Sequence, residues 1–120
     1  MAKPVTIIGG GVAGLTLGIG LRQLGVPVVI HEAGTYPRHR VCGEFISGRG
    51  QTTLARLGLG ELIGKAGAVS AQTVAFFTAT KAAAPHPLPS AAICVSRFTL
   101  DAVLDKQFRK LGASCVSPNA

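Results

Sequence analysis

Apolar residues in the first third of the chain form two short continuous runs, and a longer apolar segment lies between them in the sequence. Pro4 to Ile8 is a short apolar run closed by glycines, which predicts a buried strand. Val12 to Leu24 is apolar on nearly every side, which predicts a helix buried between layers. Val26 to His31 is β-branched and continuous, as strands of a parallel sheet are when both faces are covered. This order predicts a βαβ unit with a right-handed crossover.

The rest of the chain predicts a looser set of elements. Ala33 to Gly48 is rich in Gly, Pro, Arg and His and predicts a loop. Phe98 to Leu111 has apolar residues at helical spacing; either Ser96 or Thr99 is expected to cap its start, and Gly112 ends it. The other expected elements are a helix over Gly48 to Leu57, a strand over Ala71 to Thr80, a turn or hairpin tip over Lys81 to Ser90, a strand over Ala92 to Val95 and a third parallel strand over Ser114 to Val116.

Composition and charge narrow the class of protein. Of 120 residues, 48% are hydrophobic and 14% are charged, which argues against intrinsic disorder. The net charge of +7 suits an anionic partner such as nucleic acid, a membrane surface or a phosphate-bearing ligand. With no Trp and one Tyr the chain has few side chains on which bases could stack, so we expect no nucleic-acid partner. No apolar stretch is long enough to predict a membrane span.

The cysteines favour a reducing compartment. Cys42, Cys94 and Cys115 are widely spaced and odd in number, and no Cys-x-x-Cys occurs, so neither a disulfide framework nor a metal site is expected. The first residues do not form a signal peptide. The expected location is the cytoplasm.

A glycine-rich motif joins the first predicted strand to the first predicted helix. It reads Gly9-Gly10-Gly11-Val12-Ala13-Gly14, a GxGxxG, and the next predicted strand is followed by Glu32, 18 residues after Gly14. The motif alone is weak, but a strand before it, a helix after it and an acid at this spacing predict dinucleotide binding.

Each position of the motif has a physical reason. Gly9 allows a tight turn, Gly11 lets backbone approach a pyrophosphate, and Gly14 lets the helix pack closely on the strand. The helix N-terminus offers N–H groups to phosphate, and Glu32 would accept hydrogen bonds from a ribose diol while disfavouring a 2′-phosphate, so NADP is the least expected ligand. The candidate cofactor-binding residues here are Gly9, Gly11, Val12, Ala13, Gly14 and Glu32. The run from Gly14 to Glu32 resembles the extended fingerprint of FAD-binding flavoproteins of the glutathione-reductase and p-hydroxybenzoate-hydroxylase type.

Two further segments carry a resemblance. Tyr36 to Ser47 (YPRHRVCGEFIS) resembles the segment after the second strand in geranylgeranyl-reductase-like proteins and related FAD-dependent monooxygenases and halogenases. Arg97 to Asp101 resembles the Arg-x-x-Leu-Asp segment of the same superfamily, so that the likeness covers Pro4 to Val116. The resemblance implies that Arg40 and Arg97 reach anionic or polar parts of FAD, and that Cys42 and Gly43 lie near the isoalloxazine.

The resemblance also implies a fold and a function. The fold class is α/β: a Rossmann-like FAD-binding βαβ domain with about three parallel strands and a small β-hairpin. Residues 1–120 are expected to be one such domain, the N-terminal fragment of an FAD-dependent oxidoreductase whose substrate domain and later FAD motifs lie outside this chain. The parent would carry out redox chemistry on a small organic substrate with NAD(P)H as reductant; the sequence does not choose between monooxygenase, reductase and halogenase, and assigns no catalytic residue. The alternatives are an NAD-binding dehydrogenase domain and a non-catalytic fragment or basic interaction module.

Overall fold

The computed structural model of the chain describes residues 2–41 and 44–118. The chain forms two compact units, which we call the first unit (Met1–Cys42 with Ser96–Ala120) and the second unit (Gly43–Val95). Each unit is described by itself below. Among the described residues, no helix combines the length and the apolar character needed to cross a bilayer.

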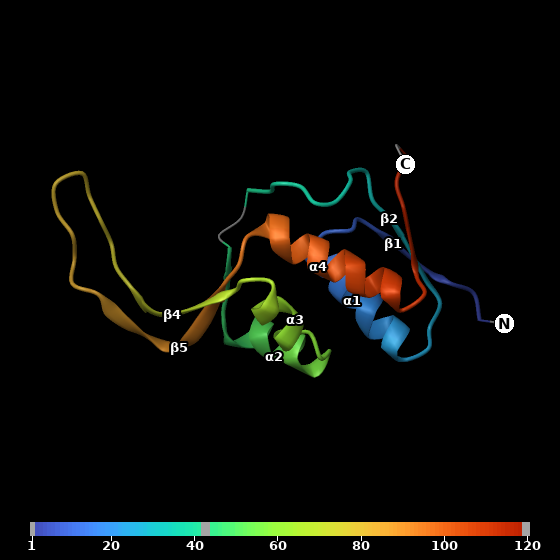
Figure 1. The fold of residues 1–120 in the computed structure, drawn as a ribbon, viewed down its shortest axis with the longest axis horizontal. Helices are drawn as coiled ribbons and strands as arrows, with labels where there is room; N and C mark the ends of the chain where they lie inside the picture. Colours follow the sequence, from blue (N-terminus) through green and yellow to red (C-terminus); the bar gives the residue numbers. More distant parts are fainter. Residues whose placement is uncertain (1, 42–43, 119–120) are drawn as a thin grey trace. The chain divides into compact units, whose positions relative to one another are not determined.

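The first unit is a parallel sheet with two helices packed on it (Figure 1). The strand order is β1-β2-β6, and both pairings are parallel, with Val5 opposite Val28 and Ile30 opposite Cys115. This arrangement confirms the predicted α/β fold with three parallel strands. The elements are β1 (Val5–Ile8), α1 (Val12–Gln23), β2 (Val28–His31), α4 (Arg97–Lys110) and β6 (Ser114–Val116).

The two helices lie side by side and cover one face of this sheet (Figure 1). Strand alternation turns Ile7, Val28 and Ile30 toward the helices, where they are buried. On the opposite face Ile8 is 81% exposed. The expectation that both faces of the sheet are covered is therefore wrong for the described residues.

Helix α1 is buried on one side only, which corrects the expectation of a helix enclosed between layers. Leu15, Gly18 and Ile19 are its buried residues, whereas Leu17 is 53% exposed. The close packing depends on Gly18, because a Cβ there would lie 2.8 Å from Phe108 Cε2 of α4 and 3.1 Å from Ile30 Cδ1 of β2. Phe108 itself is fully buried at this junction.

The second unit is an antiparallel sheet with two short helices. Its strand order is β3-β5-β4, which contains the predicted hairpin as β4 and β5. The helix expected over Gly48 to Leu57 is present with Leu57 as its C-cap. The elements are β3 (Phe45–Ile46), α2 (Gly48–Arg56), α3 (Gly60–Lys65), β4 (Val69–Val74) and β5 (His86–Cys94).

Four features of this unit differ from the predictions. The expected loop over Ala33 to Gly48 contains the short strand β3, and helix α3 was not predicted. The strand expected over Ala71 to Thr80 starts and ends earlier, as β4. The expected turn over Lys81 to Ser90 is shorter because β5 already begins at His86, despite its two prolines. Pro is tolerated there because β3 pairs with β5 only at Ile93 and Cys94, so one edge of β5 is free of that partner near Pro87.

Candidate functional site

The glycine motif forms a tight turn from the end of β1 into α1. Gly9 has a φ of +102°, a conformation that side chains disfavour. A Cβ on Gly14 would run into the carbonyl oxygen of Gly9, so the first turn of α1 packs directly on the loop that precedes it. Gly11 is the N-cap residue of α1, and no side chain makes a capping hydrogen bond there. The N-terminus of α1 thus keeps the backbone donors and partial positive charge that bind anions.

A cleft of about 580 Å³ lies over this turn, entirely within the first unit. It brings together most of the residues that the sequence singled out, while Val12 belongs to the turn without lining the cleft. Cys42 and Gly43 lie outside the described residues. The lining consists of Ile7, Ile8, Gly9, Gly11, Ala13, Gly14, Leu17, Glu32, Arg40, Val41 and Arg97.

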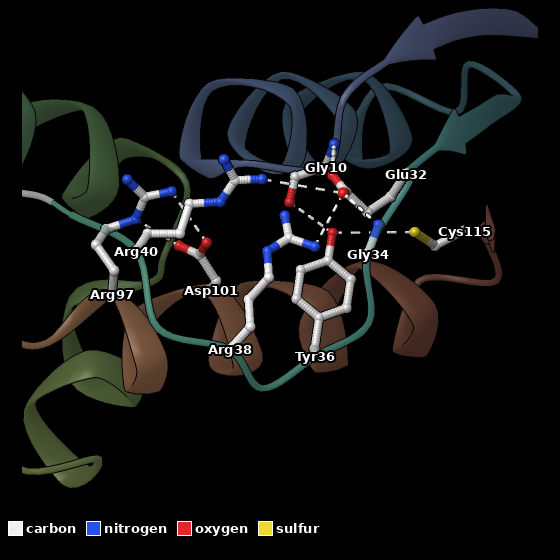
Figure 2. A network of polar contacts seen from close by, with 9 residues as sticks. All are labelled: Gly10, Glu32, Gly34, Tyr36, Arg38, Arg40, Arg97, Asp101 and Cys115. Atoms are coloured by element: carbon white, nitrogen blue, oxygen red, sulfur yellow. Dashed lines mark hydrogen bonds and ion pairs between the residues drawn. The ribbon is translucent and has the colours of Figure 1, made fainter. Parts of the chain in front are cut away.

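Glu32 follows β2 directly and is held by three donors (Figure 2). Its Oε2 accepts the Gly10 N–H at 2.6 Å, and its Oε1 accepts the Gly34 N–H at 2.8 Å. Arg38 forms an ion pair with Oε1, with NH1 at 2.8 Å. Arg40 NH2 lies 4.0 Å from the same oxygen.

The carboxyl group of Glu32 is ionised at neutral pH although its side chain is only 5% exposed. Burial raises its pKa, but Arg38 and the N–H groups of Gly34 and Gly10 outweigh that effect and lower the pKa of Glu32 to about 2. The neighbouring His31 is exposed, as expected from strand alternation. The site therefore presents a fixed, buried negative charge at the end of β2.

Tyr36 closes the same network from the loop after β2 (Figure 2). Its hydroxyl donates to the Gly10 carbonyl oxygen at 2.5 Å and lies 4.0 Å from Cys115 Sγ of β6. The guanidinium carbon of Arg38 lies 5.2 Å from the centre of the Tyr36 ring. Burial raises the pKa of Tyr36, so the phenol stays protonated and remains a donor.

Sequence reasoning did not assign Gly10, Tyr36 or Arg38 to the site. A signal was present, because Gly10 is the middle one of three consecutive glycines, at a position where the motif accepts any residue. In the structure a Cβ on Gly10 would run into the Tyr36 hydroxyl.

Arg97 reaches the glycine turn from the start of α4. Its Nε and NH2 donate to the two carboxylate oxygens of Asp101 at 2.8 and 3.0 Å, one helical turn along α4. Asp101 is fully buried, so this bidentate pair fixes the guanidinium rather than leaving it mobile. A Cβ on Gly11 would lie 3.6 Å from Arg97 NH2, which places this cation beside the turn. Asp101 is a further residue whose part in the site was not identified from the sequence.

Comparisons with known proteins agree on one family. The sequence profile of a family described as FAD binding domain matches residues 2–116. No curated protein sequence matches the chain.

Solved structures of flavoproteins share the fold. The tetrameric form of 2-methyl-3-hydroxypyridine-5-carboxylic acid oxygenase is 25% identical with a TM-score of 0.84, over 97% of this chain and 31% of that one. The flavin-dependent brominase Bmp2 is 26% identical with a TM-score of 0.74, over 92% of this chain and 28% of that one. The flavin-dependent monooxygenase PieE, solved with FAD and substrate, is 20% identical with a TM-score of 0.78, over 95% of this chain and 23% of that one, a likeness of fold. The chain thus spans about a third or less of the proteins it matches.

The residues of the cleft fit the nucleotide half of FAD. A turn without Cβ atoms leaves room for phosphate at a helix N-terminus, and an ionised acid stands at the end of the next strand. The family match selects FAD over the NAD alternative and confirms the resemblance to flavoproteins of the p-hydroxybenzoate-hydroxylase type. FAD is the cofactor of this chain, which belongs to the FAD binding domain family.

Proposed function

We propose that the cleft of the first unit holds the ADP half of FAD. The backbone of Gly9, Gly11, Val12, Ala13 and Gly14 would bind the pyrophosphate. Glu32 would accept hydrogen bonds from the adenosine ribose. The observation that carries this proposal is that the bare glycine turn and the buried, ionised Glu32 line one cleft.

Arg40 and Arg97 would add positive charge for the anionic and polar parts of FAD. Both line the cleft, and Arg97 is oriented by Asp101 at the edge of the glycine turn. A guanidinium held in this way suits phosphate because its donors form a fixed fork. By resemblance, Cys42 and Gly43 would lie near the isoalloxazine.

The parent protein is proposed to be an FAD-dependent oxidoreductase of which residues 1–120 are the FAD-binding part. FAD would supply the electron transfer, with NAD(P)H as reductant and a small organic molecule as substrate. The residues of this chain would bind and orient the cofactor. The names of the similar structures, an oxygenase and a brominase, support redox chemistry on a small molecule. The free thiols of Cys94 and Cys115 support a cytoplasmic location.

Titration of the whole chain with FAD, followed by quenching of flavin fluorescence, tests the proposal. Gly11→Val places a branched side chain at the turn, and Glu32→Ala removes the ribose acceptor. We expect Glu32→Ala to weaken FAD binding by about tenfold or more, since one lost charge-assisted hydrogen bond costs about 1.5–3 kcal/mol. Gly11→Val should weaken it as well, because the added side chain would occupy the space in which the pyrophosphate approaches the backbone.

Two matched variants serve as controls. Glu61→Ala removes an acid that is 80% exposed and that pairs with Lys65, and Gly64→Ala adds a methyl group with no atom of the described residues within 4 Å outside its own helix backbone and chain neighbours. Both should bind FAD as the unchanged chain does. Unaltered FAD affinity in both Gly11→Val and Glu32→Ala would refute the assignment of the site.

A further inference from the structure

We infer that Tyr36 and Arg38 are positioning residues that hold the ribose-binding carboxylate and the glycine turn in their binding geometry before the cofactor arrives. This inference rests on the proposed function of the same cleft. Both residues belong to the segment Ala33 to Arg38, which we call the strap. The strap folds back from the end of β2 over Gly10 (Figure 2).

Both polar backbone groups of Gly10 are engaged by this network. Its N–H donates to Glu32 Oε2 at 2.6 Å, and its carbonyl oxygen accepts from the Tyr36 hydroxyl at 2.5 Å. The orientation of the peptide groups on either side of Gly10 is therefore fixed by side chains from 22 and 26 residues later in the chain. Since Gly9 and Gly11 flank this residue, holding Gly10 also holds the turn on which phosphate would lie.

Gly10 is matched to the strap as well as to the turn. A Cβ there would run into the Tyr36 hydroxyl and lie 3.1 Å from both Cβ and Oε2 of Glu32. Gly34 is matched to Arg38 in the same way, because a Cβ on Gly34 would run into the guanidinium. The absence of a Cβ at Gly10 and Gly34 thus leaves the space that the side chains of Tyr36 and Arg38 occupy.

The burial of Arg38 leaves donor atoms of its guanidinium without hydrogen bonds to the described part of the chain, which is unfavourable for the stability of the fold. Its side chain is 18% exposed, and its Nε and NH2 atoms are buried without a hydrogen-bond partner among the described residues. Unpaired buried donors on a cation destabilise a fold. Among the described residues its ion pair is with Glu32, and its guanidinium carbon lies 5.2 Å from the centre of the Tyr36 ring. We therefore assign Arg38 the role of fixing the Glu32 carboxylate.

The strap also determines which carboxylate oxygen stays open. Oε1 accepts the Gly34 N–H and faces Arg38, whereas Oε2 accepts only the Gly10 N–H in the described network. A carboxylate oxygen has two acceptor positions. The remaining position on Oε2 is the one left for a ribose hydroxyl.

The experiment compares FAD binding by the whole chain and by three variants. Tyr36→Phe deletes a single hydroxyl, Arg38→Met deletes the charge, and Arg38→Lys restores a charge without the fork. Arg56→Met is the control, since it removes an exposed arginine of α2 in the second unit, outside the cleft lining. Melting temperatures are recorded alongside, so that loss of binding is separated from loss of fold.

We expect Arg38→Met to weaken FAD about tenfold at pH 7 and Tyr36→Phe about threefold, with Arg38→Lys between Arg38→Met and the unchanged chain. The pH dependence of FAD affinity shows whether Arg38 acts on the Glu32 carboxylate or only stabilises the fold. The unchanged chain should hold its FAD affinity to about pH 3, whereas Arg38→Met should lose affinity near the ordinary carboxyl range of about 4 to 5.

Several charged or titratable groups act on this carboxylate and its partner Arg38. The groups that bear on this profile are Arg38, Arg40 and Tyr36 of the loop, Cys115 of β6, and Asp101 of α4. All except the substituted residue are unchanged in Arg38→Met, so a shifted profile reports on Glu32. In a Glu32→Gln background Arg38→Met should cause no further loss of affinity.

The outcomes separate this inference from the proposed function. A wild-type chain that does not bind FAD overturns both. A chain that binds FAD and is weakened by Glu32→Ala, but binds equally well with the same pH profile after Arg38→Met and Tyr36→Phe, overturns the positioning role alone. A loss in Arg38→Met that persists in full in the Glu32→Gln background also overturns it, since Arg38 would then not act through Glu32.

Discussion

Glu32 shows how one residue can be buried and charged at once. Its carboxylate is surrounded by two backbone N–H groups and the guanidinium of Arg38, which replace the water it lost. The stability of the first unit is therefore linked to pH through this residue. The linkage follows from the position of its pKa, about 2 in the fold against an ordinary value of 4.5.

The contribution of Glu32 is present above the ordinary carboxyl pKa and is lost as the pH falls toward the depressed one. Between about pH 5 and pH 2 the free energy of unfolding should fall by roughly 3 kcal/mol from this group. Glu32→Gln should remove that part of the slope while lowering stability at pH 7. Urea denaturation at a series of pH values measures both effects.

Glu61→Gln is the control for this measurement, because the Glu61 side chain is 80% exposed and its ion pair with Lys65 lies at the surface. It should leave the slope of the unchanged chain in place. Identical slopes for Glu32→Gln and the unchanged chain would contradict the linkage.

Residues whose role follows from local geometry were the ones predicted from the sequence. The roles of Gly9 and Gly14 follow from their positions in the motif. The structure shows the expected positive φ at Gly9 and the expected close packing at Gly14. Tyr36 and Arg38 were not predicted because no spacing rule says which side chains of a loop fold back on the preceding turn. Asp101 was noted only as part of a resemblance, because its spacing from Arg97 allows an ion pair but does not show that the carboxylate is buried.

At the scale of elements, α4 positions Arg97 through its own first turn. Ser96 is the N-cap, and its Oγ accepts the Thr99 N–H at 3.1 Å. The bidentate pair between Arg97 and Asp101 spans the next turn. The cap and the pair together determine where the helix begins and where its first cation lies.

Ser96→Ala should lower the free energy of unfolding by about 1 kcal/mol, because an orphan N–H loses its acceptor. Ser47→Ala is a matched control, since Ser47 occupies the N-cap position of α2 without a side-chain capping hydrogen bond. Thermal or urea denaturation compares them. Equal losses in the two variants would show that the Ser96 bond contributes nothing specific.

Elements with strong periodicity were predicted, and elements decided by tertiary contacts were not. The βαβ unit and α4 have long apolar patterns, and both appear close to the expected bounds. Helix α3 has six residues between glycines, too few to show a period. Strand β5 contains two prolines, which predict a turn from the sequence alone. A strand is possible there because β3 pairs with β5 only at Ile93 and Cys94, beyond both prolines.

At the scale of the whole molecule, several large apolar side chains remain in contact with solvent. Phe76 and Phe77, in the connection between β4 and β5, are 73% and 74% exposed (Figure 1). Only three charged residues, Lys65, Lys81 and Arg97, occur in the sequence between Glu61 and Asp101, so this stretch has few charges to keep copies apart. Both phenylalanines fall in the strand expected over Ala71 to Thr80, but β4 ends at Val74 and leaves their side chains exposed.

Replacement of both phenylalanines by serine should reduce self-association of the chain at high concentration, because adjacent exposed apolar side chains promote contact between copies. Sedimentation velocity over a range of concentrations measures this, and the melting temperature should stay unchanged. Leu24→Ser is the control, because its side chain is 80% exposed but belongs to the first unit, at the end of α1, and has no second large apolar side chain next to it in the sequence. Association that is the same in the double variant and the unchanged chain would contradict the expectation.

The glycines of α1 have a consequence for how this domain acquires its structure. Gly14, Gly18 and Gly20 all lie inside the helix, and each weakens an isolated helix by about 0.5–1 kcal/mol relative to alanine. A segment with three such positions in 12 residues does not hold a helix by local propensity alone. Its helical state therefore depends on contacts with other elements, of which Ile30 of β2 and Phe108 of α4 lie closest to Gly18. A peptide cut from this region is expected to be unfolded in water, and the turn and helix N-terminus that it forms in the whole domain would be absent from it.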